Sequence, residues 1–282
     1  MLGYKKNIFM LPFDHRHSFV KSFGFKEILN KDQFKRIELY KDIIYKGFLL
    51  ARKNIKNKAA TSILVDEYFG AKILRSAKRN KILFACSTEK SGQKYFDFEY
   101  SKNFKKAITR INPTFVKSLV RYDIKDKKDN LIQLKKLKQL NDFCKEEKRI
   151  FLIELLTPIC TNKAIMTAKV ISEFQSFDID PDIWKIEAYD KKSDWKLIIE
   201  QIKNNDSRKN VGIIMLGRGE NLSHVKKWIN IAKQFKDING FAVGRTVFED
   251  ALIDLHSAKL TNQEAIKIIA DRYLQLVRLW TK

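Results

Sequence analysis

The chain has few of the residues that build disulfide frameworks and metal centres. Its three cysteines, Cys86, Cys144 and Cys160, are widely separated and form no CxxC pair. This spacing argues against a disulfide framework and against a cysteine-based zinc site. The four histidines likewise lack HExxH or similar metal-ligand spacing. The sequence therefore predicts no metal site.

Long apolar stretches and linker-like segments are also missing. No apolar run approaches the roughly 20 residues that a membrane-spanning helix needs. The N-terminal residues 1–6 lead directly into a short strand-like run, without a small-residue cleavage site. No segment is rich in proline, glycine or serine. These absences predict a cytoplasmic protein that has a single domain and no membrane partner.

Positive charge, by contrast, is abundant. The 56 Lys and Arg residues against 33 Asp and Glu residues give a formal net charge of +23. Such an excess can mark nucleic-acid binding, but these lysines are spread along the whole chain, and runs such as 125–129 and 135–138 are typical of solvated helix faces. We therefore expect no nucleic-acid partner and a modest attraction for an anionic small molecule. A basic nucleic-acid-binding protein is the alternative outside the enzymes, and it would require lysines gathered on one face.

Strand-length apolar runs alternate with helix-period segments along the 282 residues. This alternation predicts a parallel α/β fold. The number of runs favours a (β/α)8 TIM barrel over an open Rossmann-like sheet, and no GxGxxG follows the first run. The expected strands lie within residues 8–13, 62–65, 82–86, 114–120, 150–156, 181–188, 211–216 and 240–243. Helices are expected at about 31–54, 129–147, 193–204, 221–235, 247–257 and 262–280.

The sixth run contains a lysine and a glutamate, Lys185 and Glu187, in an otherwise apolar setting. On a strand, these two side chains would project to one face and Trp184 and Ile186 to the other. A charge on a buried face is costly unless it is paired or neutralised. A lysine in such a place can lose its proton and attack a carbonyl carbon. Lys185 is therefore a candidate nucleophile.

Lys117 and Glu154 interrupt two other apolar runs. Each alone is explained equally well by a structural ion pair or by catalysis. Together with Lys185 they would form a constellation in which a neighbouring ammonium favours the neutral amine and a carboxylate moves protons. Active sites of TIM barrels lie at the carboxyl ends of the strands. The other polar residues at these predicted ends are Asp14, Asp66, Glu89, Lys90, Arg121, Glu187, Arg218 and Arg245.

Two glycine–arginine turns follow the last two runs. They are Gly217-Arg218-Gly219 and Gly244-Arg245-Thr246. Glycine lets the backbone approach an anion, and arginine and helix-terminal N–H groups supply donors. The loops after strands 7 and 8 are the customary phosphate site of this fold. Ordinary βα turns are the alternative, but we expect a phosphorylated small-molecule substrate.

Four motifs resemble a family of known enzymes. They are LPFDHR at 11–16, FACSTEK at 84–90, WKIE at 184–187 and GFAVGRTVF at 240–248. The chain resembles the class I aldolase superfamily of the tagatose 1,6-bisphosphate aldolase type, with sulfofructose phosphate aldolase nearby. The motifs at 215–219 and 240–248 are most similar to the 2-deoxy-5-keto-gluconate 6-phosphate aldolase domain of inositol catabolism. The resemblance extends over almost the whole chain.

The resemblance implies roles for particular residues. Lys185 would form the Schiff base and Glu154 would act as acid/base at the bond that breaks. Asp14 and Lys117 match positions that support the lysine and the substrate. The implied substrate- and phosphate-binding residues are Arg16, Glu89, Lys90, Glu187, Gly217, Arg218, Gly219, Gly244 and Arg245.

The reaction implied by this resemblance is the cleavage of 2-deoxy-5-keto-gluconate 6-phosphate to dihydroxyacetone phosphate and malonate semialdehyde. It requires neither a metal nor another cofactor. Tagatose 1,6-bisphosphate or a sulfofructose phosphate is the alternative substrate. His17 departs from the glycine usual in the tagatose branch, and this departure leaves the substrate selectivity open. A barrel that binds a sugar phosphate without cleaving it is a further alternative. The sequence does not decide between a monomer and a homo-oligomer.

Overall fold

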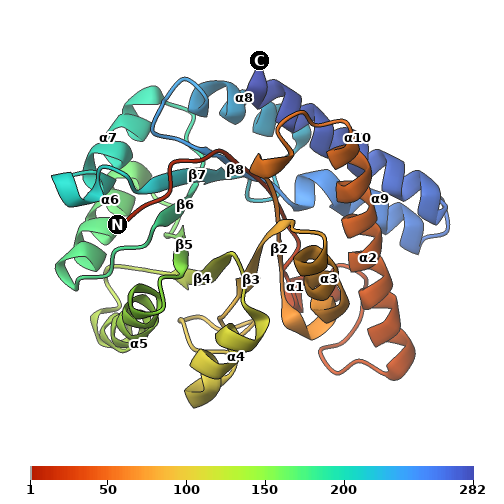
Figure 1. The fold of residues 1–282 in the computed structure, drawn as a ribbon, viewed down its shortest axis with the longest axis horizontal. Coiled ribbons are helices and arrows are strands. Elements are labelled where there is room, and N and C mark those ends of the chain that lie inside the picture. The colour runs from red at the N-terminus through yellow and green to blue at the C-terminus, as the bar shows by residue number, and fades with distance from the viewer. Residues whose placement is uncertain (1) are drawn as a thin grey trace. The chain divides into compact units, whose positions relative to one another are not determined.

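The computed structural model describes residues 2–282. Eight strands form a closed barrel whose neighbours follow the order of the sequence (Figure 1). The pairs β1–β2, β2–β3, β4–β5, β5–β6 and β6–β7 are parallel. The predicted (β/α)8 TIM barrel is therefore confirmed, and the open Rossmann-like alternative is wrong. The strands are β1 (Ile8–Pro12), β2 (Thr61–Val65), β3 (Leu83–Ser87), β4 (Phe115–Arg121), β5 (Ile150–Leu156), β6 (Ile183–Glu187), β7 (Gly212–Leu216) and β8 (Gly240–Ala242).

Helices follow the strands as a TIM barrel requires. All six helices expected from the sequence are present, and α1, α3, α4 and α6 are added to them. Within residues 2–282, no helix is both long and apolar enough to cross a membrane. The helices are α1 (His17–Lys21), α2 (Lys31–Lys53), α3 (Glu67–Arg79), α4 (Phe104–Ile111), α5 (Lys127–Glu146), α6 (Lys163–Ser176), α7 (Lys192–Ile202), α8 (Leu222–Ala232), α9 (Arg245–His256) and α10 (Asn262–Thr281).

Contacts within the chain divide it into two compact units, each made of separated segments. The first unit comprises the described residues up to Asn7, Ser87–Leu216 and Ile231–Gly240. The second unit comprises Ile8–Cys86, Gly217–Asn230 and Phe241–Lys282. The first unit thus holds β4 to β7, and the second holds β1, β2 and most of β3 and β8. The expectation of a single domain stays a prediction.

In the first unit, the N-terminal segment contacts residues at the start of β4 and just before β6. Asp182 accepts hydrogen bonds from the backbone N–H of Gly3 at 2.8 Å and of Phe151 at 2.9 Å. The Tyr4 ring meets Phe115 edge-on, with 5.4 Å between the ring centroids. Gly3 has φ +110°, a conformation that only glycine adopts easily. These contacts fix the amino-terminal ends of β4 and β5 and the entry to β6.

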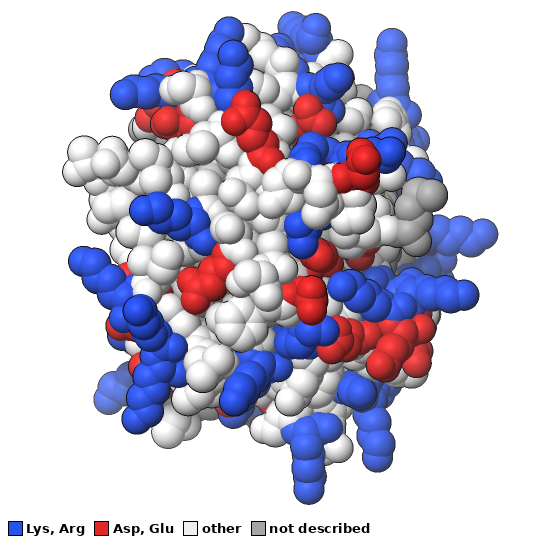
Figure 2. All heavy atoms as spheres, turned by 90° about the vertical axis from the view of Figure 1, so that its left-hand side faces the viewer, with Lys and Arg blue, Asp and Glu red and all other residues white. Residues whose placement is uncertain are grey.

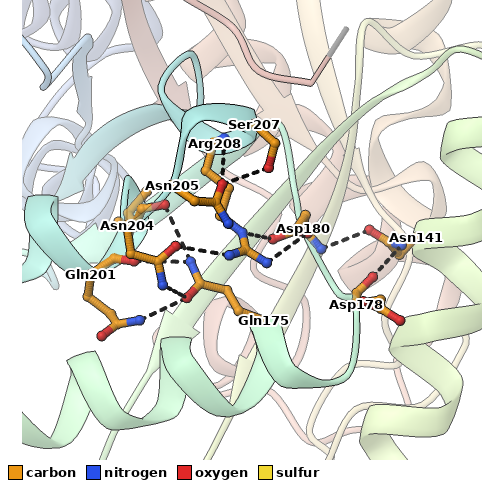
Figure 3. Close-up of polar contacts among 10 residues, drawn as sticks. Asn141, Gln175, Asp178, Asp180, Gln201, Asn204, Asn205, Ser207 and Arg208 are labelled. Atoms are coloured by element: carbon orange, nitrogen blue, oxygen red, sulfur yellow. Dashed lines mark hydrogen bonds and ion pairs between the residues drawn. The ribbon is translucent and has the colours of Figure 1, made fainter.

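A polar network in the same unit joins the segments that lead into β6 and β7 (Figure 3). Arg208 donates to both carboxylate oxygens of Asp180, at 2.7 and 3.3 Å, and to Oδ1 of Asn204 at 2.9 Å. Asn204 in turn donates to Oε1 of Gln175 at 3.0 Å. A two-point contact between arginine and carboxylate fixes the orientation of both partners. The network therefore holds the start of β6, the strand that carries Lys185.

Candidate active site

Strand β6 directs Lys185 away from the helices. The Trp184 ring lies against Phe174 of α6, with 5.8 Å between the ring centroids. Because successive side chains of a strand alternate between its faces, Lys185 and Glu187 point toward the barrel interior. Lys185 is only 3% exposed, in a strand whose other residues are also buried. The burial expected for this lysine is thus present.

The register of β5 and β6 brings Glu154 beside Lys185. These two residues are direct partners in the parallel pairing. Lys185 Nζ lies 2.8 Å from Glu154 Oε1, and the glutamate side chain is 13% exposed. An ammonium and a carboxylate at this distance form a charge-assisted hydrogen bond. Two residues that are 31 positions apart in the sequence therefore form one buried ion pair.

Lys117, on β4, extends this pair into a cluster of alternating charge. Its Nζ lies 3.1 Å from Glu154 Oε2 and 2.6 Å from Glu89 Oε1. We call Lys185, Glu154, Lys117 and Glu89 the lysine–glutamate cluster. Burial of a charge is costly unless an opposite charge and hydrogen bonds compensate it. With two ammonium and two carboxylate groups in contact, the cluster is compensated and tolerates its buried position.

The arrangement is suited to moving a proton to and from an amine. Each oxygen of Glu154 contacts a different ammonium, at 2.8 and 3.1 Å. Glu154 is thus within proton-transfer reach of Lys185, while Lys117 donates to its other oxygen. An amine that has given up its proton is a nucleophile toward carbonyl carbon. The cluster therefore contains a candidate nucleophile, its candidate base and a cation that orients the base.

Two predicted binding residues of the first unit contact other partners. Lys90 Nζ pairs with Asp97 Oδ2 at 3.0 Å. Glu187 Oε1 pairs with Lys163 Nζ at 2.7 Å, and its Oε2 accepts from the Thr157 N–H at 3.3 Å. Glu187 therefore fastens the loop that follows β5. The substrate-binding roles of Lys90 and Glu187 stay predictions.

The second unit contains another buried group of charges. Asp14 and Arg16, at 8% and 9% exposure, flank His15, whose backbone oxygen accepts from Lys41 Nζ at 3.0 Å. Lys41 is fully buried and forms an ion pair with Asp66. Burial lowers the pKa of the Lys41 ammonium, and the Asp66 carboxylate opposes that shift. Lys41 thus holds the loop that carries Asp14 and Arg16.

Lys41 is not among the residues predicted from the sequence. A usable signal was nevertheless present, because Lys41 lies four residues after Ile37 and three before Ile44 in α2. Residues at these spacings share one face of a helix. A lysine within the apolar stripe of a helix is therefore a sign of a buried ion pair.

The two glycine–arginine turns of the second unit are tied to each other. Arg245 Nη2 donates to the backbone oxygen of Arg218 at 2.8 Å. Thr246 Oγ1 donates to the backbone oxygen of Glu220 at 2.6 Å. The turns after β7 and β8 therefore lie side by side, an arrangement that the phosphate prediction requires.

Glycine is required at two positions of these turns. Gly219 has φ +81°, and a Cβ there would lie 2.7 Å from Cζ of Arg245. A Cβ at Gly244 would lie 2.1 Å from the backbone oxygen of Pro12. Gly217 is less constrained, since its nearest contact would be Val243 Cγ2 at 3.2 Å. Close backbone approach accounts for the glycines, and phosphate binding at these turns stays a prediction.

The charged groups of residues 2–282 form no metal-binding cluster, and on the face drawn in Figure 2 the Lys and Arg side chains form no compact patch. Among residues 2–282, no group of three or more His, Cys, Asp or Glu side chains is placed to hold a metal ion. On the face drawn in Figure 2, Lys and Arg side chains are spread over the surface, with Asp and Glu side chains between them. The excess of positive charge is thus distributed over this face.

Comparisons with known proteins identify a family and a fold. The sequence model of the family described as "Uncharacterized protein conserved in bacteria (DUF2090)" matches residues 3–282. A comparison with curated proteins gave no match. The structure is similar to fructose-bisphosphate aldolase from Plasmodium falciparum, with a TM-score of 0.66 and 12% identity over 96% of this chain and 89% of that one. It is also similar to Cgl0159 from Corynebacterium glutamicum, with a TM-score of 0.62 and 13% identity over 96% of this chain and 88% of that one.

Proposed function

This chain belongs to the DUF2090 family, and we propose that it is a class I aldolase in which Lys185 forms a Schiff base with a phosphorylated keto sugar or keto acid. The observation that carries the proposal is the buried contact of 2.8 Å between Lys185 Nζ and Glu154 Oε1. The lysine reacts as the neutral amine, and a carboxylate in contact with it can move protons at the carbon atoms that become attached to it; Glu154 occupies that place. Lys117, 3.1 Å from the other oxygen, fixes the orientation of the carboxylate.

The reaction follows from the chemistry of these groups. Neutral Lys185 attacks the ketone carbon of the substrate, and loss of water leaves an iminium. Glu154 takes the proton of the hydroxyl on the far side of the bond that breaks. The bonding electrons move into the iminium, which gives an enamine and releases an aldehyde. Protonation of the enamine and hydrolysis of the imine then release the ketone product and restore Lys185.

The substrate class rests on the motifs rather than on the cluster. The motifs at 215–219 and 240–248 resemble 2-deoxy-5-keto-gluconate 6-phosphate aldolases, so we prefer this keto acid phosphate, cleaved to dihydroxyacetone phosphate and malonate semialdehyde. Tagatose 1,6-bisphosphate and a sulfofructose phosphate are the alternatives within the same reaction. The likeness to a fructose-bisphosphate aldolase concerns the fold, and the chemical argument comes from Lys185, Glu154 and Lys117.

Borohydride trapping tests the proposed nucleophile. Incubation with dihydroxyacetone phosphate, the expected ketone product, followed by sodium borohydride should attach the reduced product to the peptide that contains Lys185, as measured by mass spectrometry. Samples without dihydroxyacetone phosphate should remain unlabelled. Labelling at another lysine would reassign the nucleophile, and no covalent adduct would contradict the aldolase proposal.

The phosphate prediction has its own test at Arg245. Replacement by alanine removes a guanidinium, and loss of a charged hydrogen bond of about 1.5–3 kcal/mol should raise KM for the phosphorylated substrate about tenfold or more. Arg272→Ala is a control in the same unit, because Arg272 pairs with Asp250, and its KM should stay unchanged. An unaltered KM in the Arg245 variant would count against phosphate binding there.

A further inference from the structure

Two consecutive residues, Thr88 and Glu89, bind the backbone and the side-chain ammonium of Lys117. The N–H and the Oγ1 of Thr88 donate to the backbone oxygen of Lys117, at 2.9 and 3.0 Å. Glu89 Oε1 accepts from Lys117 Nζ at 2.6 Å. The backbone and the ammonium of this lysine are thus fixed by a single short segment that follows β3.

This segment begins a hairpin that comprises residues 88–99. Glu89 forms an isolated antiparallel bridge with Phe98. The Lys90 N–H donates to the backbone oxygen of Asp97, and the Glu99 N–H to that of Thr88, both at 2.9 Å. These paired backbone groups leave Glu89 little freedom to move.

The far part of the 88–99 hairpin is anchored on α5. Asp97 contacts Lys136 at 2.7 Å and Lys90 at 3.0 Å, and the Phe96 N–H donates to Gln133 at 3.1 Å. Partial burial raises the pKa of Asp97, but the hydrogen bonds from Lys136 and Lys90 outweigh this effect and lower it to about 2. Asp97 is therefore charged at neutral pH, and the anchor is intact there. Contacts of the 88–99 hairpin with itself and with α5 therefore fix the position of Glu89.

We propose that Glu89 is a positioning residue, which holds the Lys117 ammonium against Glu154. This role replaces the substrate binding that the family resemblance implies for Glu89. Glu89 is 6% exposed, with Oε1 directed at Lys117. Without it, the Lys117 side chain can turn away, and Glu154 Oε2 loses the donor at 3.1 Å that orients it toward Lys185. This inference rests on the proposed aldolase function, because the geometry that it protects is that of the proton transfer by Glu154.

Kinetics of Glu89→Ala separate positioning from binding. A small displacement of a catalytic group can cost about 100-fold in rate, so kcat should fall about 100-fold with KM unchanged. Trapping of dihydroxyacetone phosphate on Lys185 by borohydride should persist, since Lys185 itself is untouched. A raised KM with normal kcat would show that Glu89 binds substrate, and unchanged kinetics would deny it any role. Either result overturns the proposal.

Two companion variants control for loss of folding. Glu89→Gln keeps an oxygen that can accept from Lys117, so its kcat should lie well above that of Glu89→Ala. A glutamine variant no better than the alanine variant contradicts positioning. Glu99→Ala, in the same hairpin, should leave kcat unchanged.

A structural measurement keeps this inference separate from the proposed function. In a crystal structure of Glu89→Ala, we expect Lys117 Nζ to have left its place beside Glu154. If Nζ remains there, Glu89 is not the residue that positions it. By contrast, absence of an adduct on the unmodified protein overturns the aldolase proposal and says nothing of what holds Lys117.

Discussion

Substitution of Lys185 by arginine should abolish turnover while the protein stays folded. Arginine keeps a positive charge beside Glu154, so the compensated lysine–glutamate cluster retains its balance. It does not form an imine, because its guanidinium stays protonated at neutral pH. Loss of a catalytic nucleophile typically costs on the order of a millionfold in kcat. Cleavage of 2-deoxy-5-keto-gluconate 6-phosphate, measured together with the thermal unfolding midpoint, checks both parts of this expectation.

A second ion-paired lysine tests whether replacement of lysine by arginine lowers turnover by itself. Lys138 pairs with Asp142 at 2.6 Å within α5, so Lys138→Arg also preserves an ion pair. Its kcat should equal that of the unmodified protein. Substantial turnover by the Lys185 variant would mean that another residue, or another mechanism, performs the reaction.

Replacement of Glu154 by glutamine should separate imine formation from bond cleavage. The amide oxygen can still accept from Lys117 or Lys185, but the amide does not take up a proton as a carboxylate does. Loss of general base catalysis typically slows a reaction about 100- to 10,000-fold. We therefore expect single-turnover cleavage to slow by that factor while borohydride still traps dihydroxyacetone phosphate on Lys185.

The control for this variant is a glutamate outside the cluster. Glu146, exposed at the end of α5, can be changed to glutamine with no expected effect on cleavage. If the Glu154 variant retained full turnover, the acid/base role would belong to another group. If it lost imine trapping as well, Glu154 would be needed for the first step rather than for cleavage.

The strands were more predictable than the helices, for a physical reason. Strands of a parallel barrel are buried on both faces, so each is a short run of apolar residues that can be recognised in the sequence without knowledge of its neighbours. Helix α4 has only eight residues, which is too short to show a sustained helical period. Helix α6 follows Asn162, a residue type favoured before helices, but this starting signal was not used. Asp66 does cap α3, but it was interpreted only as a polar residue at a strand end.

The site was predictable where charges interrupt strands and unpredictable where partners come from elsewhere. Lys185, Glu154 and Lys117 stand out because each breaks an apolar run. The contact between Glu89 and Lys117 depends on the hairpin after β3, and that between Glu187 and Lys163 on the start of α6. Such pairings depend on three-dimensional register, which a local pattern of residues does not encode.

The hydrogen bond from Gly3 to Asp182 has a consequence for the timing of folding. These residues are 179 positions apart, and at about 5–20 residues per second a ribosome takes roughly 10–40 s to make the chain between them. Throughout that time the N-terminal segment has no Asp182 to bind. Contacts between residues this distant also close slowly, because a long loop must be ordered first. The segment around Gly3 is thus among the last parts of this chain to reach its native contacts.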